Sequence, residues 1–233
     1  MHEANNSARR ITDAQIGIHK NLALVVKKHF RNQHKKPIAK HTQDAFDVVK
    51  DKVEVHLKAG KSLIFDSCCG TAMSTQIIAL ENPSALVLGI DRSAVRLAKE
   101  TNVKLPGNVI LVQAECADFW KLAVGAGWQL QKHTILYPNP YPKSKHLKRR
   151  WHGHPAFPDL LALGGELELR SNWKVYMDEF CEAVKILEDK IYGCRSVEEL
   201  AVINPLTLFE KKYQENGQSL YSCKITLKNT LFT

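Results

Sequence analysis

Apolar residues follow two different patterns along this chain. Before residue 58 they recur every three or four positions over residues 12–30 and about 42–57, which predicts two amphipathic helices. A basic segment that contains Pro37 separates these stretches and predicts a linker. From residue 62 onward, short runs typical of strands alternate with helical stretches. This alternation predicts a mostly parallel sheet with helices on both faces.

Six of the short runs predict strands. They cover residues 62–66, 86–91, 109–112, 134–137, 166–170 and 220–227. Further helices are predicted near residues 71–81, 92–101, 117–123 and 174–189. Because ligands of such sheets bind beyond the carboxyl ends of the strands, we expect the chemistry of this protein at those ends.

The length and composition fit a soluble protein with one α/β domain. The chain has 233 residues, of which 44% are hydrophobic, and no run of eighteen apolar residues predicts a membrane span. The first residues lack the apolar region of a secretory signal. Six cysteines without a C-x-x-C pair indicate neither a disulfide framework nor a zinc site. We therefore expect a reducing, cytoplasmic location and no bound metal.

Positive charge is concentrated in two segments. The chain carries 33 basic and 24 acidic residues, a net charge of +9. Residues 1–43 contain nine lysines and arginines against two acids, and residues 143–150 contain five against none. The remainder is therefore slightly acidic. Two basic segments on such a body indicate a polyanionic partner, and we expect this partner to be nucleic acid. We also expect the protein to act as a monomer.

The first predicted strand ends in Asp66, and small residues lead from it into a helix. Ser67, Cys68 and Gly70 belong to this turn. Small side chains let a ligand approach the backbone closely, as nucleotide-binding loops require. A dinucleotide oxidoreductase is not indicated, because the turn lacks the G-x-G-x-x-G pattern.

Acidic residues follow the second and third predicted strands. Asp91, with Arg92 next to it, lies where Rossmann-type folds hydrogen-bond a ribose diol. Its negative charge disfavours NADP and tolerates a cationic sulfonium ligand. Glu115 follows the third strand, where an acid could contact an adenine amine. These positions indicate a cofactor that contains a nucleoside.

The fourth predicted strand ends in a proline-rich segment. Pro138, Pro140 and Pro142 fix an extended backbone around Asn139 and Tyr141. Such a stiff segment is expected to aim the amide and the aromatic ring at a site. The segment that follows is predicted to bind phosphates through its basic side chains: Lys143, Lys145, His146, Lys148, Arg149 and Arg150.

Four stretches of the sequence resemble the bacterial tRNA (guanine-N(7)-)-methyltransferase family. Residues 137–150 resemble its F-x-D-P-W-P-K-x-R-H-x-K-R-R segment, and residues 164–176 resemble its G-G-x(4–5)-T-D…Y segment. Residues 205–210 resemble its T-x-F-E unit, and residues 10–15 resemble its basic R-x-T…Q lead-in. The chain is therefore identified as a member of a divergent branch of this family.

The resemblance implies a fold, a cofactor and a substrate. The fold is that of a class I S-adenosylmethionine-dependent methyltransferase, a Rossmann-like sheet of about seven strands. Its last strand, residues 220–227, would be antiparallel. Residues 59–233 would form this domain, and residues 1–58 a basic helical arm and linker that contacts RNA. The cofactor would be S-adenosyl-L-methionine, and the product would be N-7-methylguanosine in tRNA.

The resemblance also implies roles for individual residues. The predicted cofactor-binding residues are Asp66, Ser67, Cys68, Gly70, Asp91, Arg92, Glu115 and Thr207. Asn139 takes the place of the family's catalytic aspartate, and Glu210 is a second candidate for catalysis beside the base. Tyr141, Asn172 and the basic residues after Pro142 are predicted to bind the substrate.

Departures from the family leave other functions open. The two family acids become Asn139 and Asn172, and an amide stabilises charge developing on a guanine less strongly than an acid. An Asn-Pro-aromatic segment is also similar to the [DN]-P-P-[YFW] motif of enzymes that methylate exocyclic amines. A third alternative is an RNA-binding protein that keeps the cofactor pocket and has lost catalytic power. Trp151, between basic residues, is a candidate for stacking on a base.

Overall fold

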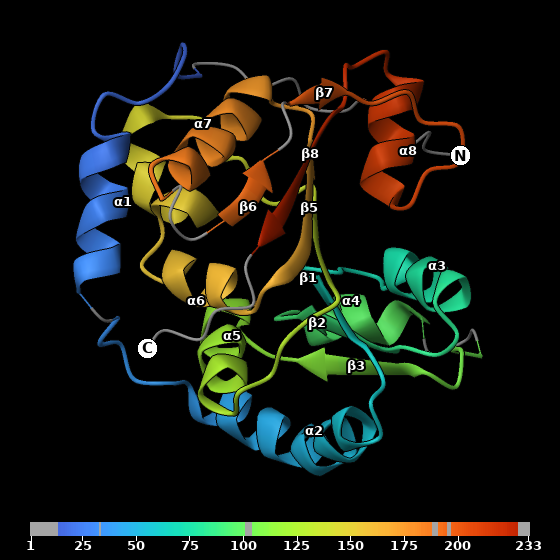
Figure 1. Ribbon diagram of the computed structural model, residues 1–233. Helices are drawn as coiled ribbons and strands as arrows, with labels where there is room; N and C mark the ends of the chain where they lie inside the picture. Colours follow the sequence, from blue (N-terminus) through green and yellow to red (C-terminus); the bar gives the residue numbers. More distant parts are fainter. Residues whose placement is uncertain (1–13, 33, 101–103, 188–190, 195–196, 228–233) are drawn as a thin grey trace.

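The computed structural model describes residues 14–32, 34–100, 104–187, 191–194 and 197–227. Its centre is an eight-stranded sheet surrounded by helices (Figure 1). The strands are β1 (Leu63–Ser67), β2 (Leu86–Asp91), β3 (Val109–Gln113), β4 (Lys132–Leu136), β5 (Gly165–Ser171), β6 (Ile191–Cys194), β7 (Glu198–Glu199) and β8 (Tyr221–Leu227). The α-helices are α1 (Leu22–Arg31), α2 (Lys40–Lys58), α3 (Met73–Glu81), α4 (Ala94–Leu97), α5 (Cys116–Gly125), α6 (Phe157–Ala162), α7 (Lys174–Lys185) and α8 (Leu208–Glu215). Short 3-10 helices are η1 (Ala98–Glu100), η2 (Ser144–Arg149) and η3 (Trp151–Gly153).

The sheet is mostly parallel, as the alternation of strands and helices predicts. The strand order is β3-β2-β1-β4-β5-β8-β6, with β7 paired to β8. Strands β1 to β5 are parallel, whereas β8 is antiparallel to β5. The prediction of a final antiparallel strand is confirmed. Strands β6 and β7, which the sequence did not predict, extend the sheet by pairing with β8.

The chain reverses its direction across the sheet beside β1. It runs outward from β1 to β2 and β3, and then returns to place β4 on the other side of β1. The loops at the carboxyl ends of β1 and β4 therefore diverge. In sheets of this kind, ligands bind in the crevice that this divergence leaves.

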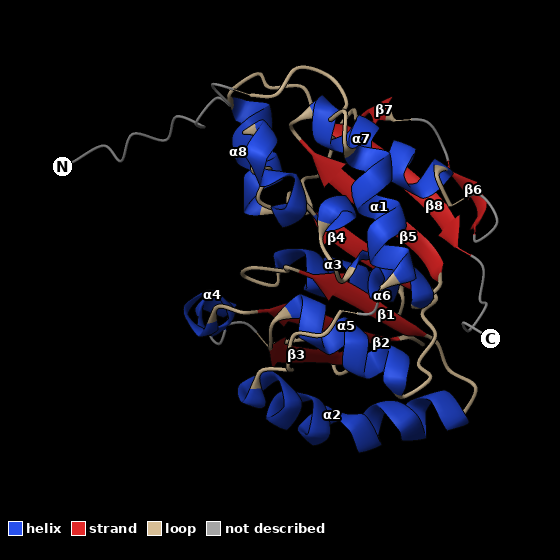
Figure 2. Cartoon of the chain, turned by 90° about the vertical axis from the view of Figure 1, so that its left-hand side faces the viewer, coloured by secondary structure: helices blue, strands red, loops and turns tan. Residues whose placement is uncertain are grey.

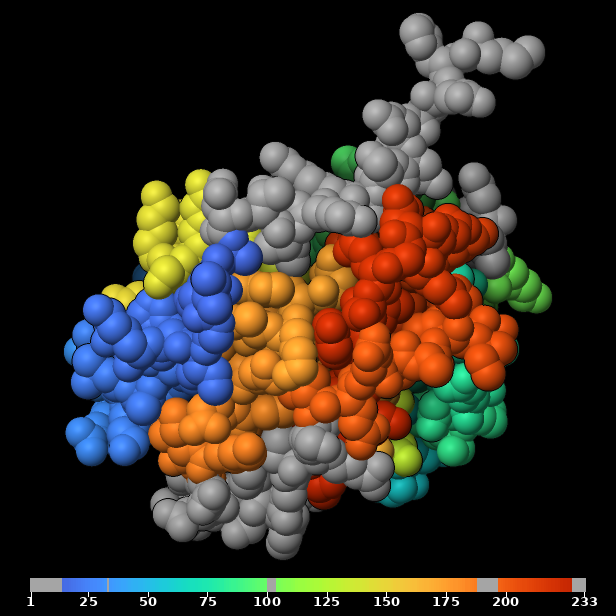
Figure 3. Space-filling view, turned by 90° about the horizontal axis from the view of Figure 1, so that it is seen from above, coloured from blue at the N-terminus to red at the C-terminus, as the bar shows by residue number. Residues whose placement is uncertain are grey.

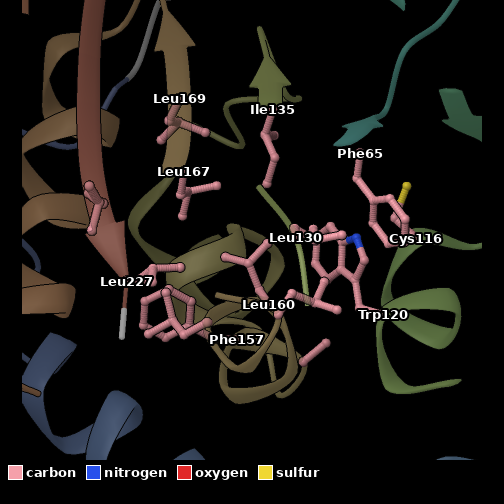
Figure 4. Packing of buried hydrophobic residues seen from close by; sticks show 14 of the residues in the cluster. Phe65, Cys116, Trp120, Leu130, Ile135, Phe157, Leu160, Leu167, Leu169 and Leu227 are labelled. Carbon is pink, nitrogen blue, oxygen red and sulfur yellow. The ribbon is translucent and has the colours of Figure 1, made fainter. Parts of the chain in front are cut away.

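Alternate residues of β1 are buried on opposite faces of the sheet. Leu63 and Phe65 belong to a large hydrophobic cluster with residues of α1, α2, α5, α6 and α7, whereas Ile64 packs with α3. Figure 4 shows Phe157 and Leu160 of α6 within the large cluster. Burial on both faces explains why the strands read as continuous apolar runs.

The two N-terminal helices belong to this same core. Val26 of α1 and Val53 of α2 have no exposed surface, and the ring of Phe46 stacks on Trp128 at a centroid distance of 4.8 Å. Helix α1 also contacts α7, and Figure 3 shows the blue α1 directly beside the orange α7. The described part of residues 1–58 is thus packed onto the sheet domain, and its contact with RNA stays a prediction.

Helix α1 is shorter than the sequence predicts. The predicted start, Thr12, lies outside the described residues, and residues 14–21 are not part of the helix. Gly17 has a positive φ of 68°, and the backbone N–H of His19 donates to Glu179 at 2.8 Å. These tertiary contacts hold the segment out of the helix, which begins at Leu22.

Candidate active site

A cavity of about 940 Å³ lies at the carboxyl ends of β1, β2 and β4. Its walls come mainly from the loop after β1, the end of β2 with α4, the start of α5, the segment after β4, and α8. Figure 2 shows α4 and α8 at the same edge of the sheet. The cavity therefore occupies the crevice beside β1 where such folds bind ligands.

The loop after β1 has an uncommon backbone. Cys68 and Ala72 have positive φ angles of 63° and 59°, and Gly70 has one of 61°. A positive φ strains residues other than glycine and is often retained at functional sites. The turn brings the backbone N–H of Gly70 to 3.0 Å from Oδ2 of Asp91, which accepts its hydrogen bond. The loop thus lies directly against the end of β2.

Asp91 ends β2 and forms part of the cavity wall. Besides the bond from Gly70, its Oδ1 accepts the backbone N–H of Ser93 at 2.8 Å. Nη1 of Arg96 lies 3.5 Å from Oδ2. A carboxylate oxygen can accept more than one hydrogen bond, so Asp91 retains capacity for the hydroxyl groups of a ligand. This arrangement suits a ribose diol.

Other predicted cofactor residues line the same cavity. Glu115 lies at the N-cap of α5 and Thr207 at the N-cap of α8, and both are half-buried. Arg92 is exposed beside the end of β2. The predicted cofactor residues in the cavity wall are Cys68, Gly70, Asp91, Arg92, Glu115 and Thr207. Their contact with a cofactor stays a prediction.

The predicted cofactor contact of Asp66 is wrong, because its side chain has no exposed surface. Its Oδ2 accepts hydrogen bonds from the hydroxyls of Ser74 at 2.6 Å and Thr75 at 2.7 Å. Its Oδ1 accepts one from the hydroxyl of Thr134 at 2.9 Å. Burial raises the pKa of Asp66, while these three hydrogen bonds oppose the rise. Asp66 therefore joins β1 to α3 and β4 beneath the cavity.

Ser67 is also closed off from the cavity, so its predicted cofactor contact is wrong. Its hydroxyl oxygen accepts the indole N–H of Trp120 at 3.0 Å and lies 2.8 Å from Nε2 of His133. Burial lowers the pKa of His133 to about 3. The imidazole is therefore neutral at pH 7 and forms part of the core below the site.

His133 should make the protein sensitive to mild acid. Because its folded-state pKa of about 3 lies below the ordinary value of 6.5, unfolding takes up a proton between these pH values. The free energy of unfolding should fall by about 2 kcal/mol from pH 7 to pH 5 through this histidine alone. Urea unfolding at both pH values should show a smaller loss in His133→Gln, and an unchanged loss in the control His41→Gln, whose side chain is exposed. Equal losses in wild type and His133→Gln would contradict this account.

The segment after β4 turns sharply at two strained tyrosines. Tyr137 and Tyr141 have positive φ angles of 51° and 45°. Between them, Pro138, Asn139 and Pro140 line the cavity. The backbone N–H of Tyr141 donates to Oδ1 of Asn139 at 3.4 Å. The structure thus brings the predicted Asn139 and Tyr141 into the cavity that Asp91 also lines.

Arg150 supports this segment from inside the protein. Its guanidinium donates to the carbonyl oxygens of Tyr141, Pro142 and Lys143 at 3.1 to 3.4 Å. The side chain has no exposed surface. The prediction that Arg150 contacts phosphate is therefore wrong: its hydrogen-bonding groups are used to fix the proline-rich backbone.

Glu179 of α7 compensates the buried charge of Arg150. Its Oε2 lies 2.5 Å from Nη1 of Arg150 and 3.0 Å from Nε2 of His152. Its Oε1 accepts hydrogen bonds from the side chain of Gln15 at 2.6 Å and from the backbone of His19 at 2.8 Å. Burial raises the pKa of Glu179, but the bond to His152 and the neighbouring charges outweigh it and lower the pKa to about 2. This cluster joins the start of the described chain to the segment after β4.

Glu210 does not face the cavity, so its predicted role in catalysis beside the base is wrong. Its side chain is fully buried. Oε1 accepts hydrogen bonds from the hydroxyl of Tyr137 at 2.7 Å and from Nη1 of Arg170 at 2.9 Å. Oε2 accepts the backbone N–H of Leu206 at 2.5 Å. Glu210 thus connects α8 to the strained turn after β4.

Two of the predicted phosphate contacts reach the cavity. Lys148 and Arg149 are exposed on η2 and line its wall. The guanidinium of Arg149 lies 5.8 Å from the ring centroid of Tyr141. Lys143 and Lys145 are exposed on the same segment outside the cavity wall. All four cations are available to an anionic ligand.

The remaining predicted substrate residues divide between the cavity wall and the surrounding protein. Trp151 lines the cavity and packs on Trp120 at a centroid distance of 4.6 Å, and its stacking on a base stays a prediction. The ring of His146 packs on Tyr141 at 6.1 Å, outside the cavity wall. Asn172 also lies outside this wall, and its amide donates to Gln218 at 2.9 Å. The structure does not bring Asn172 to the site.

Helix α8 brings to the cavity an aromatic residue that the sequence did not indicate, Tyr213, next to Phe209 of the family-like unit 205–210. Phe209 and Tyr213 line the cavity and stack on each other at a centroid distance of 6.2 Å. The helix is short and mostly polar, so it shows no clear apolar period. A signal was nevertheless present, because Thr207 and Glu210 have the spacing of a capping box.

The sheet order and the cavity at its switch point define a class I methyltransferase fold. A family model described as "Putative methyltransferase" matches residues 60–223, and the chain belongs to this family. The tRNA (guanine-N(7)-)-methyltransferase of Ectopseudomonas mendocina is 25% identical over 173 residues, which cover 69% of this chain and 70% of that protein. The protein of the same name from Treponema pallidum is 26% identical over 166 residues, 68% of this chain and 64% of that protein. The family resemblance seen in the sequence is confirmed.

Solved structures show the same fold. A structure described as an antibiotic related methyltransferase covers 76% of this chain and 92% of its own, with a TM-score of 0.54 and 14% identity. A variant of the 16S rRNA (adenine(1408)-N(1))-methyltransferase from Catenulisporales acidiphilia, with cosubstrate SAM, covers 78% of this chain and 93% of its own. Its TM-score is 0.55 and its identity is 13%. The methyltransferase fold predicted from the sequence is confirmed.

Among the described residues, no group of three or more histidine, cysteine or acidic side chains is placed to hold a metal ion. Within the same part of the chain, no helix is long and apolar enough to cross a membrane.

Proposed function

We propose that this protein transfers a methyl group from S-adenosylmethionine to N-7 of a guanine in tRNA. The observation that carries the proposal is one cavity lined both by Asp91 and Glu115 and by Asn139 and Tyr141. The first pair suits a nucleoside cofactor, and the second suits a purine. The substrate is inferred from the relatives, which are named tRNA (guanine-N(7)-)-methyltransferases.

The residues around the loop after β1 fit S-adenosylmethionine. Asp91 has acceptor capacity for ribose hydroxyls, and Glu115 is placed at the start of α5 to accept from an adenine amine. The strained turn at Cys68 and Gly70 lets a ligand approach the backbone. When bound, the cofactor supplies an activated methyl group on a sulfonium.

The chain's own residues would contribute mainly alignment. Guanine N-7 carries a lone pair and no proton, so methylation requires no general base. Holding the nucleophile about 3 Å from the methyl group and in line with it can contribute several kcal/mol. Tyr141 and Asn139 on their rigid segment would orient the purine. Arg150 and Glu210 hold that segment by hydrogen bonds and do not line the cavity themselves.

An enzyme that methylates an exocyclic amine would need an acceptor for the amine N–H, which the amide oxygen of Asn139 could supply. The amide oxygen of Asn139 already accepts the backbone N–H of Tyr141 at 3.4 Å. Among the described residues, the NH2 group of Asn139 has no protein partner. An amide oxygen has two lone pairs, so Asn139 retains capacity to accept from a substrate, and the rate of the Asn139→Asp variant distinguishes the two reactions.

Asn139→Asp should raise the rate of guanine N-7 methylation roughly tenfold. One carboxylate oxygen would accept from Tyr141, and the other would place negative charge in the cavity, near the positive charge that develops on the purine. The measurement is single-turnover methyl transfer to unmodified tRNA, with Asn139→Ala as the variant that lacks both groups. An unchanged or lower rate in Asn139→Asp would favour an enzyme that methylates amines.

Nucleoside analysis tests the proposed reaction in the cell. Mass spectrometry should find less 7-methylguanosine in tRNA from a deletion strain than in tRNA from its parent. Loss of a methylated adenine instead would select the amine-methylating function. Unchanged nucleosides, together with S-adenosylhomocysteine binding in a calorimetric titration of the purified protein, would select the RNA-binding protein that keeps the cofactor pocket without catalysis.

We further propose that the enzyme acts as a cytoplasmic monomer and that residues 1–58 contribute to RNA binding. Residues 1–43 have nine basic against two acidic residues. Helix α1 is packed on the core, so its basic side chains project from fixed backbone positions. Such a surface suits a structured RNA better than a flexible strand.

A further inference from the structure

A second basic surface lines the same cavity and follows β2, which lies on the other side of β1 from β4, the strand that leads to η2. Arg92 follows the end of β2, and Arg96 and Lys99 follow at spacings of four and three along α4 and η1. All three side chains are exposed, and all three line the cavity. Arg96 of α4 and Lys99 of η1 are three residues apart and share one side of this helical stretch, whereas Arg92 precedes the N-cap Ser93 and reaches the cavity from the end of β2. We refer to these three residues as the α4 margin.

The cavity therefore has cations on two separate elements. Lys148 and Arg149, the η2 margin, come from the segment after β4, whereas the α4 margin comes from the segment after β2. The acids in the cavity wall are Asp91 and Glu115. Five basic side chains thus stand against two acids, and Asp91 is already bonded to the backbone of Gly70 and Ser93.

This excess of positive charge is not explained by the cofactor. S-adenosylmethionine carries a sulfonium and an ammonium against one carboxylate, so it is a net cation, and its single carboxylate cannot balance five basic side chains. Arg96 lies near Asp91, but among the described side chains Arg92 and Lys99 have no ion-pair partner. An anion supplied by the substrate would balance these charges. Phosphate groups of RNA provide negative charge at regular spacing along a strand.

We propose that the α4 margin binds backbone phosphates of the substrate RNA on the opposite side of the methylated base from the η2 margin. The strand crosses the mouth of the cavity, with the base between the two margins beside Asn139 and Tyr141. Phosphates held on both sides fix the position of the base along the strand. This inference rests on the proposed function, since it assumes that RNA is the substrate.

Lys99 gives the sharpest test, because it lies on the α4 margin and is not bonded to Asp91. Binding of unmodified tRNA is measured over a series of salt concentrations for wild type, Lys99→Ala and Lys99→Glu. The control is Lys104→Ala, an exposed lysine nearby that does not line the cavity. Lys148→Ala reports on the η2 margin. Calorimetric titration with S-adenosylhomocysteine checks that the cofactor site is intact in every variant.

Lys99→Ala should weaken tRNA binding about three- to tenfold and reduce the slope of log K against log[salt] by about 0.9. Lys99→Glu should weaken it further, Lys104→Ala should leave it unchanged, and S-adenosylhomocysteine should bind all variants equally. If Lys148→Ala weakens binding and Lys99→Ala does not, the α4 margin does not bind RNA. The further inference then fails, while the proposed function stands. Equal effects of Lys99→Ala and Lys104→Ala would also overturn the inference, because they would reflect only the overall positive charge of the protein. If wild type shows no salt-dependent binding of tRNA, the proposed function itself fails.

Discussion

Replacing Arg150 with methionine should lower the free energy of unfolding by about 3–5 kcal/mol. The substitution would leave Glu179 as an uncompensated buried charge, because the two side chains form an ion pair without solvent contact. It would also remove the donors of three carbonyl groups in the proline-rich segment. The measurement is urea unfolding at neutral pH, followed by circular dichroism.

The neighbouring Arg149 provides the matched control. Its side chain is exposed, so Arg149→Met should change the free energy of unfolding by no more than about 0.5 kcal/mol and should instead weaken RNA binding. The double variant Arg150→Met, Glu179→Gln should regain part of the lost stability, since the unpaired charge is removed. A stable Arg150→Met variant with weaker tRNA binding would reverse this assignment and restore Arg150 as a phosphate contact.

Asp91→Ala should weaken S-adenosylhomocysteine binding by about 2–3 kcal/mol, roughly two orders of magnitude in Kd. The carboxylate would lose its hydrogen bonds to the ribose, and the backbone N–H groups of Gly70 and Ser93 would lose their acceptor. The loop after β1 would then be held less firmly at the cofactor. Isothermal titration calorimetry gives the affinity directly.

Two controls separate binding from folding in this experiment. Asp44→Ala removes an exposed acid that does not line the cavity and should leave the affinity unchanged. The thermal unfolding midpoint of Asp91→Ala shows whether the variant is folded at the temperature of the titration. A folded Asp91→Ala that binds S-adenosylhomocysteine as tightly as wild type would refute the assignment of Asp91 to the ribose.

The charged residues of the family-like segments illustrate where sequence reasoning fails. Arg150 follows directly after Arg149 in one basic run, yet the first is buried and the second is exposed. The partner that makes the difference, Glu179, is 29 residues away in α7. Glu210 likewise meets Arg170, which is 40 residues away. Such long-range pairs leave no periodic signal in the local sequence.

The acids at the strand ends show the same limit. Asp66 and Asp91 both occupy the carboxyl end of a predicted strand, and their local sequences do not distinguish them. Asp66 faces three hydroxyls, one of them from Thr134, which lies 68 residues away on β4. Asp91 meets the loop after β1 and retains access to the cavity. Only the packing of neighbouring elements decides which acid can reach a ligand.

The sequence by itself determined the class of fold, the central strands and the position of the site along the chain. Its apolar runs identify the residues that are buried in the core on folding. The order of strands and helices restricts the sheet topologies that can bury them. The prolines around Asn139 and the small residues around Gly70 also marked parts of the site, because backbone stiffness and side-chain size belong to the covalent chain, and Asp91 was marked as an acid at the end of a strand. The tertiary structure decided which charged side chains face the cavity and which support it from within. That choice depends on partners distant in sequence, since a buried charge is tolerated only where the folded chain supplies its counter-charge.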